Sequence, residues 1–131
     1  MLLDTSGLMC VFDKRERHHA EAVKLYEGAS RRFSHNYVLA EFVALAATRR
    51  APRELALEFV VALLKSTEVK LLWIDEDTHC SAVAFLQGRL DKEWSLCDAV
   101  SFILMRGRSE IEALTTDHHF EQAGFIRLLS S

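Results

Sequence analysis

The sequence predicts an α/β fold in which a mainly parallel β-sheet is covered by helices on both faces. The main observation is that short apolar runs, typical of buried strands, alternate with longer segments whose apolar residues recur at helical spacing. The second is size: 131 residues, half of them hydrophobic, suit one domain with a core of its own. Since no repeat, low-complexity tract or linker divides the chain, we expect a single domain over residues 1–131.

The first half of the chain predicts two strands and four helices. The apolar run at residues 1–4 predicts one strand, and residues 32–35 predict a second. Apolar residues at helical spacing place the helices up to residue 12 and at residues 15–27, 37–50 and 53–66. Suitable residues stand at the helix ends: Ser6 and Asn36 as N-caps, Gly28 as a stop, and Pro52 beside a first turn.

The second half predicts three strands and three helices. The strands are expected at residues 69–74, 111–116 and 125–129, and the helices at residues 76–89, 96–105 and 118–123. Their ends carry Asp75 and Ser95 as N-caps, and Gly107 and Gly124 as stops. We expect right-handed connections between the parallel strands.

Composition excludes several classes of protein. The formal net charge of -3 disfavours a protein that holds nucleic acid on a broad basic surface, although carboxylate-bound metal would bring its own positive charge. Cys10, Cys80 and Cys97 lack the spacing of a zinc site and are expected to be buried thiols in a reducing compartment. Neither a signal peptide nor a membrane span is apparent, so we expect a cytoplasmic protein.

Four of the 19 acidic residues lie in segments that we expect to be buried. Asp4 and Asp117 stand at the carboxyl ends of predicted strands, where open α/β sheets bind ligands. Glu41 and Asp98 lie within strongly apolar helices. A buried carboxylate without a partner is unfavourable by several kcal/mol, so a cluster of them needs a cation. Oxygen ligands suit Mg²⁺ or Mn²⁺, which activate water for attack on a phosphodiester.

Each acid also has a structural explanation. The two aspartates at strand ends can cap the helices that follow them, and Asp98 suits the first turn of its helix. Glu41 has no capping role, but it can pair with an arginine from elsewhere in the fold, such as Arg49 or Arg32. These explanations are common for single acids, and four at once make the metal-site interpretation the stronger one.

Four segments carry a resemblance to a known family. They are, in order, MLLDTSGLM, HNYVLAEFVAL, SLCDAVSFILM and TTDHHFEQAGF. Together they resemble the four acidic motifs of the PIN-domain family, in its VapC-like branch of toxin ribonucleases. The resemblance runs from Asp4 to the last predicted strand, and the last two motifs are the most specific.

The resemblance implies a PIN domain with parallel strand order 3-2-1-4-5 and an endoribonuclease that uses Mg²⁺ or Mn²⁺. Asp4 and Asp98 match the firmest metal ligands, and Glu41 and Asp117 match acids that complete the site, often through water. Such proteins commonly form homodimers, and a cognate VapB-like antitoxin holds them inactive by covering the active-site groove. Other classes stay open: a nuclease without an antitoxin, a PIN scaffold that only binds, and, less favoured, a phosphohydrolase with an aspartate nucleophile.

Several neighbours of the four acids have weaker signals. Thr5, Ser6, Thr115 and Thr116 can donate hydrogen bonds to a metal shell, but helix capping explains Ser6 and strand propensity explains the last two equally well. His118 and His119 are expected to be structural or surface residues, because adjacent histidines on a helix point in different directions. The clustered arginines can bind RNA phosphates or simply lie at solvated helix ends: Arg31 and Arg32, Arg49, Arg50 and Arg53, and Arg106 and Arg108.

Overall fold

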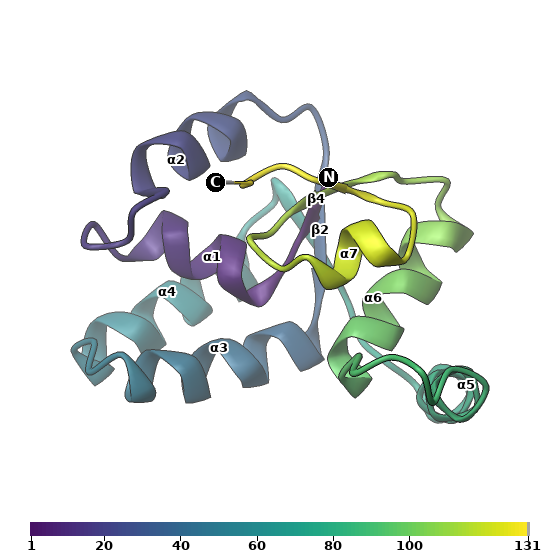
Figure 1. Cartoon of the computed structure of the whole chain (residues 1–131). Coiled ribbons are helices and arrows are strands. Elements are labelled where there is room, and N and C mark those ends of the chain that lie inside the picture. Colours follow the sequence, from purple (N-terminus) through teal and green to yellow (C-terminus); the bar gives the residue numbers. More distant parts are fainter. Residues whose placement is uncertain (131) are drawn as a thin grey trace.

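A parallel sheet runs through the centre of the molecule, with strands in the order β3-β2-β1-β4-β5 (Figure 1). The computed structural model describes residues 1–130. Within them the strands are β1 (Leu2–Leu3), β2 (Arg32–His35), β3 (Val69–Leu72), β4 (Glu112–Leu114) and β5 (Ile126–Arg127). All four strand pairs are parallel. The α/β class and the expected strand order are therefore confirmed.

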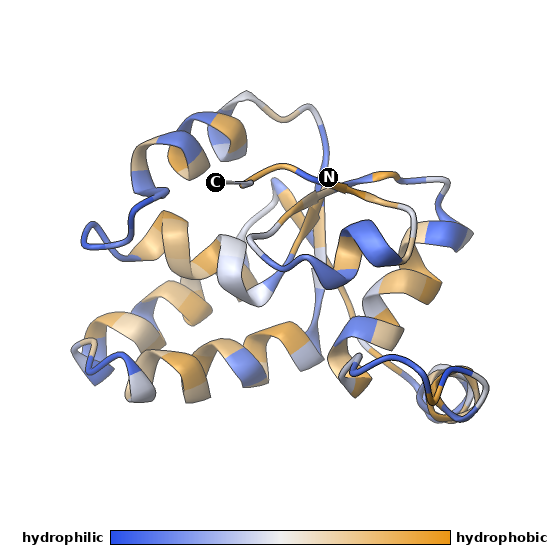
Figure 2. Cartoon of the chain, in the orientation of Figure 1, coloured by the Kyte–Doolittle hydropathy of each residue, from blue (hydrophilic) through white to orange (hydrophobic). Residues whose placement is uncertain are grey.

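Helices cover both faces of this sheet. Residues 1–130 contain α1 (Thr5–Phe12), α2 (His19–Gly28), α3 (Asn36–Thr48), α4 (Arg53–Lys65), α5 (Glu76–Gln87), α6 (Leu96–Gly107) and α7 (His119–Gln122). Figure 2 shows that hydrophobic residues dominate α1 and α6, while the segments between helices are largely hydrophilic. Over these residues, none of the helices has both the length and the apolar character that crossing a membrane requires.

The two residues of the central strand β1 face different cores. Leu3 lies in the core formed with α1 to α4, and Leu2 lies in the core formed with α6 and α7. Several phenylalanines are buried in these cores, among them Phe42, Phe102, Phe120 and Phe125. A strand that is apolar on both faces is typical of a parallel sheet covered by helices, and it fixes the position of the residue that follows, Asp4.

Several helix starts differ from the prediction. Asp4 rather than Ser6 occupies the N-cap position of α1, and its side chain makes no capping hydrogen bond. His35 precedes α3, while the side chain of Asn36 instead accepts a hydrogen bond from the backbone N–H of Ile74. In both cases a contact with a distant segment replaces the local capping bond. Tertiary contacts of this kind are invisible to local sequence rules.

Two further predictions need correction. Helix α2 begins at His19 rather than near residue 15, because the side chain of Asp13 holds the backbone N–H and the guanidinium of Arg15 in a turn. Cys80, expected to be buried, is exposed on α5, whereas the other two cysteines are buried.

His35 ends β2 and is fully buried. Its Nε2 lies 2.8 Å from Ser101 Oγ, and its Nδ1 has no hydrogen-bond partner. Burial without a nearby carboxylate lowers the pKa of the imidazole to about 4. His35 is therefore neutral in the folded protein at physiological pH.

We expect His35 to destabilise the protein in acid. Because its pKa is lower in the folded state, its contribution is fully present above about pH 6.5 and is lost as the pH falls through about 4. The loss amounts to about 3 kcal/mol. In His35→Gln, which does not titrate and keeps an amide near Ser101, this part of the pH dependence should disappear. Urea unfolding of both proteins at pH 7 and pH 4.5 measures it, and parallel pH profiles would contradict the prediction.

Candidate functional site

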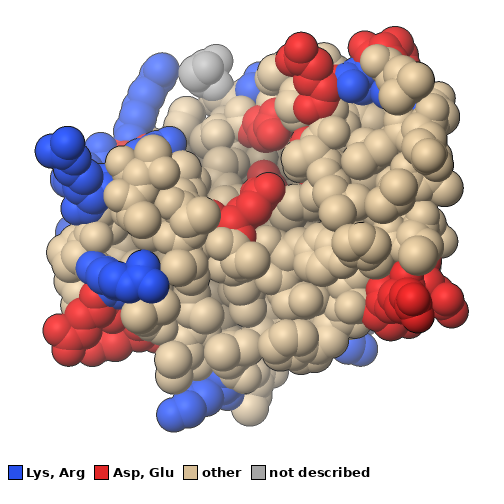
Figure 3. Space-filling model, turned by 90° about the horizontal axis from the view of Figure 1, so that it is seen from below, with Lys and Arg blue, Asp and Glu red and all other residues tan. Residues whose placement is uncertain are grey.

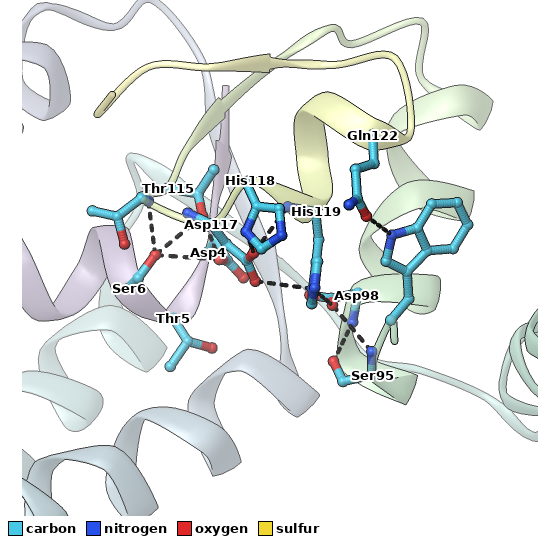
Figure 4. Close-up of polar contacts among 12 residues, drawn as sticks. Asp4, Thr5, Ser6, Ser95, Asp98, Thr115, Asp117, His118, His119 and Gln122 are labelled. Atoms are coloured by element: carbon cyan, nitrogen blue, oxygen red, sulfur yellow. Dashed lines mark hydrogen bonds and ion pairs between the residues drawn. The ribbon is translucent and has the colours of Figure 1, made fainter. Parts of the chain in front are cut away.

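The site lies where the carboxyl ends of β1 and β4 meet (Figure 4). Leu3 and Leu114 are paired across the two strands, and the backbone N–H of Asp4 donates to the carbonyl oxygen of Leu114 at 3.2 Å. Asp4 thus stands at the same level as Thr115, which follows β4. Helices α3 and α6 bring the other two predicted acids from elsewhere in the sequence, Glu41 and Asp98.

Asp4 is buried, with 5% of its surface exposed. Thr115 Oγ1 donates to its Oδ2 at 2.7 Å, and Ser6 Oγ lies 3.5 Å from the same oxygen. Burial raises the pKa of Asp4 to about 7, and the negative charges of Asp98 and Glu41 add to this increase, while the Thr115 hydrogen bond opposes it. No lysine or arginine of residues 1–130 forms an ion pair with Asp4.

Glu41 is exposed, contrary to the prediction that its apolar helix would bury it. Its Oε1 accepts a hydrogen bond of 2.8 Å from Thr5 Oγ1 at the start of α1. The arginine partners considered for it are occupied elsewhere: Arg49 pairs with Glu16, and Arg32 donates to backbone carbonyls at the end of α2. The Glu41 carboxylate therefore faces the site and has no ion-pair partner within residues 1–130.

Asp98 combines a structural contact with a position in the site. It lies at the third position of α6 in a capping box, donating its N–H to Ser95 Oγ and accepting from Ser95 N–H at 3.1 Å. The same Oδ2 lies 3.0 Å from His119 Nδ1. Burial raises the pKa of Asp98, and the charge of Asp117 contributes to that shift. Capping explains why an acid is tolerated here, but not why three other acidic or imidazole groups surround it.

Asp117 is half-buried and follows Thr115 and Thr116 after β4. Its N–H donates to Thr115 Oγ1 at 3.0 Å, and its Oδ1 accepts from the backbone N–H of His119 at 2.9 Å. His118 precedes α7 without a capping bond of its own, and the Asp117 side chain instead accepts the N–H of the first helical residue, as the capping explanation expected. These backbone contacts hold the carboxylate toward Asp98.

The hydroxyl groups of the weaker candidates connect the acids. Ser6 Oγ lies 3.0 Å from Thr115 Oγ1 and accepts from the backbone N–H of Thr116 at 3.0 Å. Thr5 holds Glu41, as described above. Thr116 takes part through its backbone. Ser6 thus joins α1 to the residues after β4, and Thr5 joins α1 to α3. Helix capping alone does not account for these contacts.

Sequence reasoning missed the place of the histidines. His119 Nδ1 lies 3.0 Å from Asp98 and 3.4 Å from Asp117, and His118 Nδ1 lies 3.7 Å from Asp117. Adjacent histidines diverge on a helix, but His118 precedes α7 and only His119 lies within it. The signal available in the sequence was the run Asp-His-His directly after a strand.

The clustered arginines do not contact the acids. Arg31, Arg32 and Arg108 line a separate cavity beside Met1, at the amino end of the sheet. Figure 3 views the molecule from below, the side on which α3 lies, and shows acidic side chains near the centre of this face with Lys and Arg mainly toward its edges. No lysine or arginine forms an ion pair with the four carboxylates in the described part of the chain.

The donor set fits a divalent metal ion. It consists of four carboxylates, two of them buried, and no lysine or arginine of residues 1–130 pairs with the buried two. Carboxylate and hydroxyl oxygens at the edge of a parallel sheet are suitable ligands for Mg²⁺ or Mn²⁺. Asp4 and Asp98 would hold the ion most directly, since they are the most buried of the four.

Comparison with known proteins agrees with this arrangement. The chain is similar to Mycobacterium tuberculosis VapC20, a toxin that cleaves the sarcin-ricin loop: the crystal structure of VapC20 shares 27% sequence identity over 95% of each chain, with a TM-score of 0.87. A search of curated proteins gave no match. Among protein families, the PIN domain matches residues 1–126. Since that match covers nearly the whole sequence and the sheet has the order expected for the fold, the chain belongs to the PIN domain family.

Proposed function

We propose that this protein is a metal-dependent endoribonuclease that acts as the toxin of a VapBC-like pair. The observation that carries the proposal is the meeting of four carboxylates at the carboxyl edge of the sheet without a lysine or arginine partner in residues 1–130. The similarity to an RNA-cleaving toxin over nearly the full length of both chains supports the same function. All four acids of the family pattern are present, which disfavours a PIN scaffold that only binds.

We assign the roles of the four carboxylates in phosphodiester cleavage from their exposure to solvent. Asp4 and Asp98, which are buried and fixed by hydrogen bonds, would hold Mg²⁺ or Mn²⁺. A bound ion of this kind lowers the pKa of water and neutralises charge on the phosphate. We assign the orientation and deprotonation of the attacking water to Glu41 and Asp117, because their carboxylates are more accessible. Thr5 keeps the Glu41 carboxylate turned toward the site.

The proposed partners are RNA, a VapB-like antitoxin and a second copy of the chain. Helix α4 supports the presence of protein partners, since it exposes four large apolar side chains: Leu55, Leu57, Val61 and Leu64. An antitoxin segment with a basic residue would match the acidic groove in charge. A nuclease without an antitoxin is the second candidate, and copurification of the chain with the product of a neighbouring small reading frame separates the two.

Incubation of the purified protein with mixed RNA tests the activity. We expect cleavage with Mg²⁺ or Mn²⁺, none in EDTA, and a decrease of about a thousandfold or more in Asp98→Asn. Asp75→Asn, which changes an exposed N-cap on α5, is the matched control and should cleave normally. Circular dichroism verifies that each variant is folded. Full cleavage in EDTA, or by folded Asp98→Asn, would refute the mechanism.

A further inference from the structure

The two ends of the acidic site differ in chemistry (Figure 4). Around Asp4 the hydrogen-bond donors are hydroxyl groups. At the other end, Asp98 and Asp117 face the imidazole rings of His118 and His119. Oxygen ligands suit Mg²⁺ and Mn²⁺, whereas a mixture of imidazole and carboxylate suits zinc and similar ions. The second end is thus built for a different class of metal.

The donor atoms at this end are close enough to share one ion. One ligand atom each from Asp117, His118 and His119 lies within 4.8 Å of the others. The nitrogen-to-oxygen distances are 3.4 Å from His119 Nδ1 to Asp117 Oδ2 and 3.7 Å from His118 Nδ1 to Asp117 Oδ1, the other oxygen of the same carboxylate. In a tetrahedral zinc site with bonds of about 2.1 Å, neighbouring ligand atoms are about 3.4 Å apart. The observed distances are close to that value.

The backbone holds the site in this shape. The N–H of His119 fixes Asp117 Oδ1, and Thr115 fixes the Asp117 N–H. The neighbouring residue Phe120 is fully buried in the core and anchors α7. The His119 ring is 20% exposed and the His118 ring 64% exposed, so an ion can reach the site from solvent. The donor side chains therefore need little rearrangement before an ion binds.

We propose that Asp117, His118 and His119 form a zinc-binding site beside the four-carboxylate site. An ion there would take two nitrogen ligands and one carboxylate oxygen from the protein. The proposal goes beyond the proposed function and does not require that the chain cleave RNA. The two sites share Asp117, so zinc would compete with an ion held by the four carboxylates.

Titration of the metal-free protein with Zn²⁺, without RNA, tests the site. Competition with a chromophoric zinc chelator gives the affinity, and a Cys80→Ser background removes the one exposed thiol of the described residues. We expect one zinc ion per chain, with an affinity at least about tenfold weaker in His118→Asn and in His119→Asn. His118 is mostly exposed, so its variant should fold even if His119→Asn does not.

Two matched variants complete the test. Asp4→Asn should retain zinc binding, because Asp4 is not among the three donors, and His18→Asn, a histidine in the loop before α2, should also retain it. Zinc binding that is lost in Asp4→Asn and kept in both site-histidine variants would place the ion among the carboxylates and overturn the proposal. The absence of saturable binding at micromolar zinc would overturn it as well. Both outcomes are distinct from a failure to cleave RNA.

Discussion

Asp4→Asn should abolish RNA cleavage and at the same time stabilise the metal-free protein. Activity should fall about a thousandfold or more, since a neutral amide replaces a buried metal ligand. Stability should rise because burial raises the pKa of Asp4 to about 7, so the charged carboxylate is unfavourable in the metal-free fold. The amide oxygen can still accept the Thr115 hydrogen bond.

The stabilisation should depend on pH. A raised pKa means that the contribution of Asp4 is fully present below about pH 4 and is lost as the pH rises through about 7. At pH 8 the charged group therefore lowers the free energy of unfolding by up to about 4 kcal/mol, which corresponds to about 15 °C in Tm. Thermal unfolding in EDTA at pH 5 and pH 8 measures the difference between Asp4→Asn and the parent. A variant that is less stable than the parent at pH 8 would show that Asp4 supports the fold.

Gly7→Ala should be the most destabilising small substitution in the site region. A Cβ at Gly7 would overlap the carbonyl oxygen of Leu114, a backbone atom that cannot move aside. Helix α1 would have to shift away from β4, so we expect a loss of at least about 3 kcal/mol in the free energy of unfolding. Because the same carbonyl accepts the Asp4 N–H, cleavage should fall with stability.

Gly28→Ala provides the matched control. A Cβ at Gly28 meets no atom within 4 Å, so this substitution should change the free energy of unfolding by less than about 1 kcal/mol. Urea unfolding of both variants measures the contrast. Equal stabilities for Gly7→Ala and Gly28→Ala would mean that α1 can move away from β4 without loss, contrary to the close packing described above.

The alternation of strands and helices was sufficient to predict the α/β class, because hydrophobic periodicity is a local property of the sequence, whereas the strand order followed only from the family resemblance. Burial of individual polar residues was harder to predict. Glu41 lies among apolar residues, yet it is exposed at the edge of the site, since α3 is not covered on that side. Serine is a typical N-cap residue, but the hydroxyl oxygen of Ser6 instead accepts a hydrogen bond from the N–H of Thr116, 110 residues away.

The acids themselves could be found from sequence because a carboxylate in an apolar segment conflicts with its surroundings. His119 could not be found in this way. A histidine is compatible with a core, a surface or a site, and only the fold of the turn before α7 brings its ring to Asp98. The residues that escaped prediction are those whose local sequence is compatible with several environments.

The capping box of α6 links helix fraying to the occupancy of the site. One oxygen, Asp98 Oδ2, accepts the Ser95 N–H and also faces His119. An ion that binds this oxygen draws on the same lone pairs that close the first turn of the helix, so ion binding and opening of that turn are thermodynamically coupled. Amide hydrogen exchange at the start of α6 should therefore report whether an ion occupies the site, without any need for a substrate.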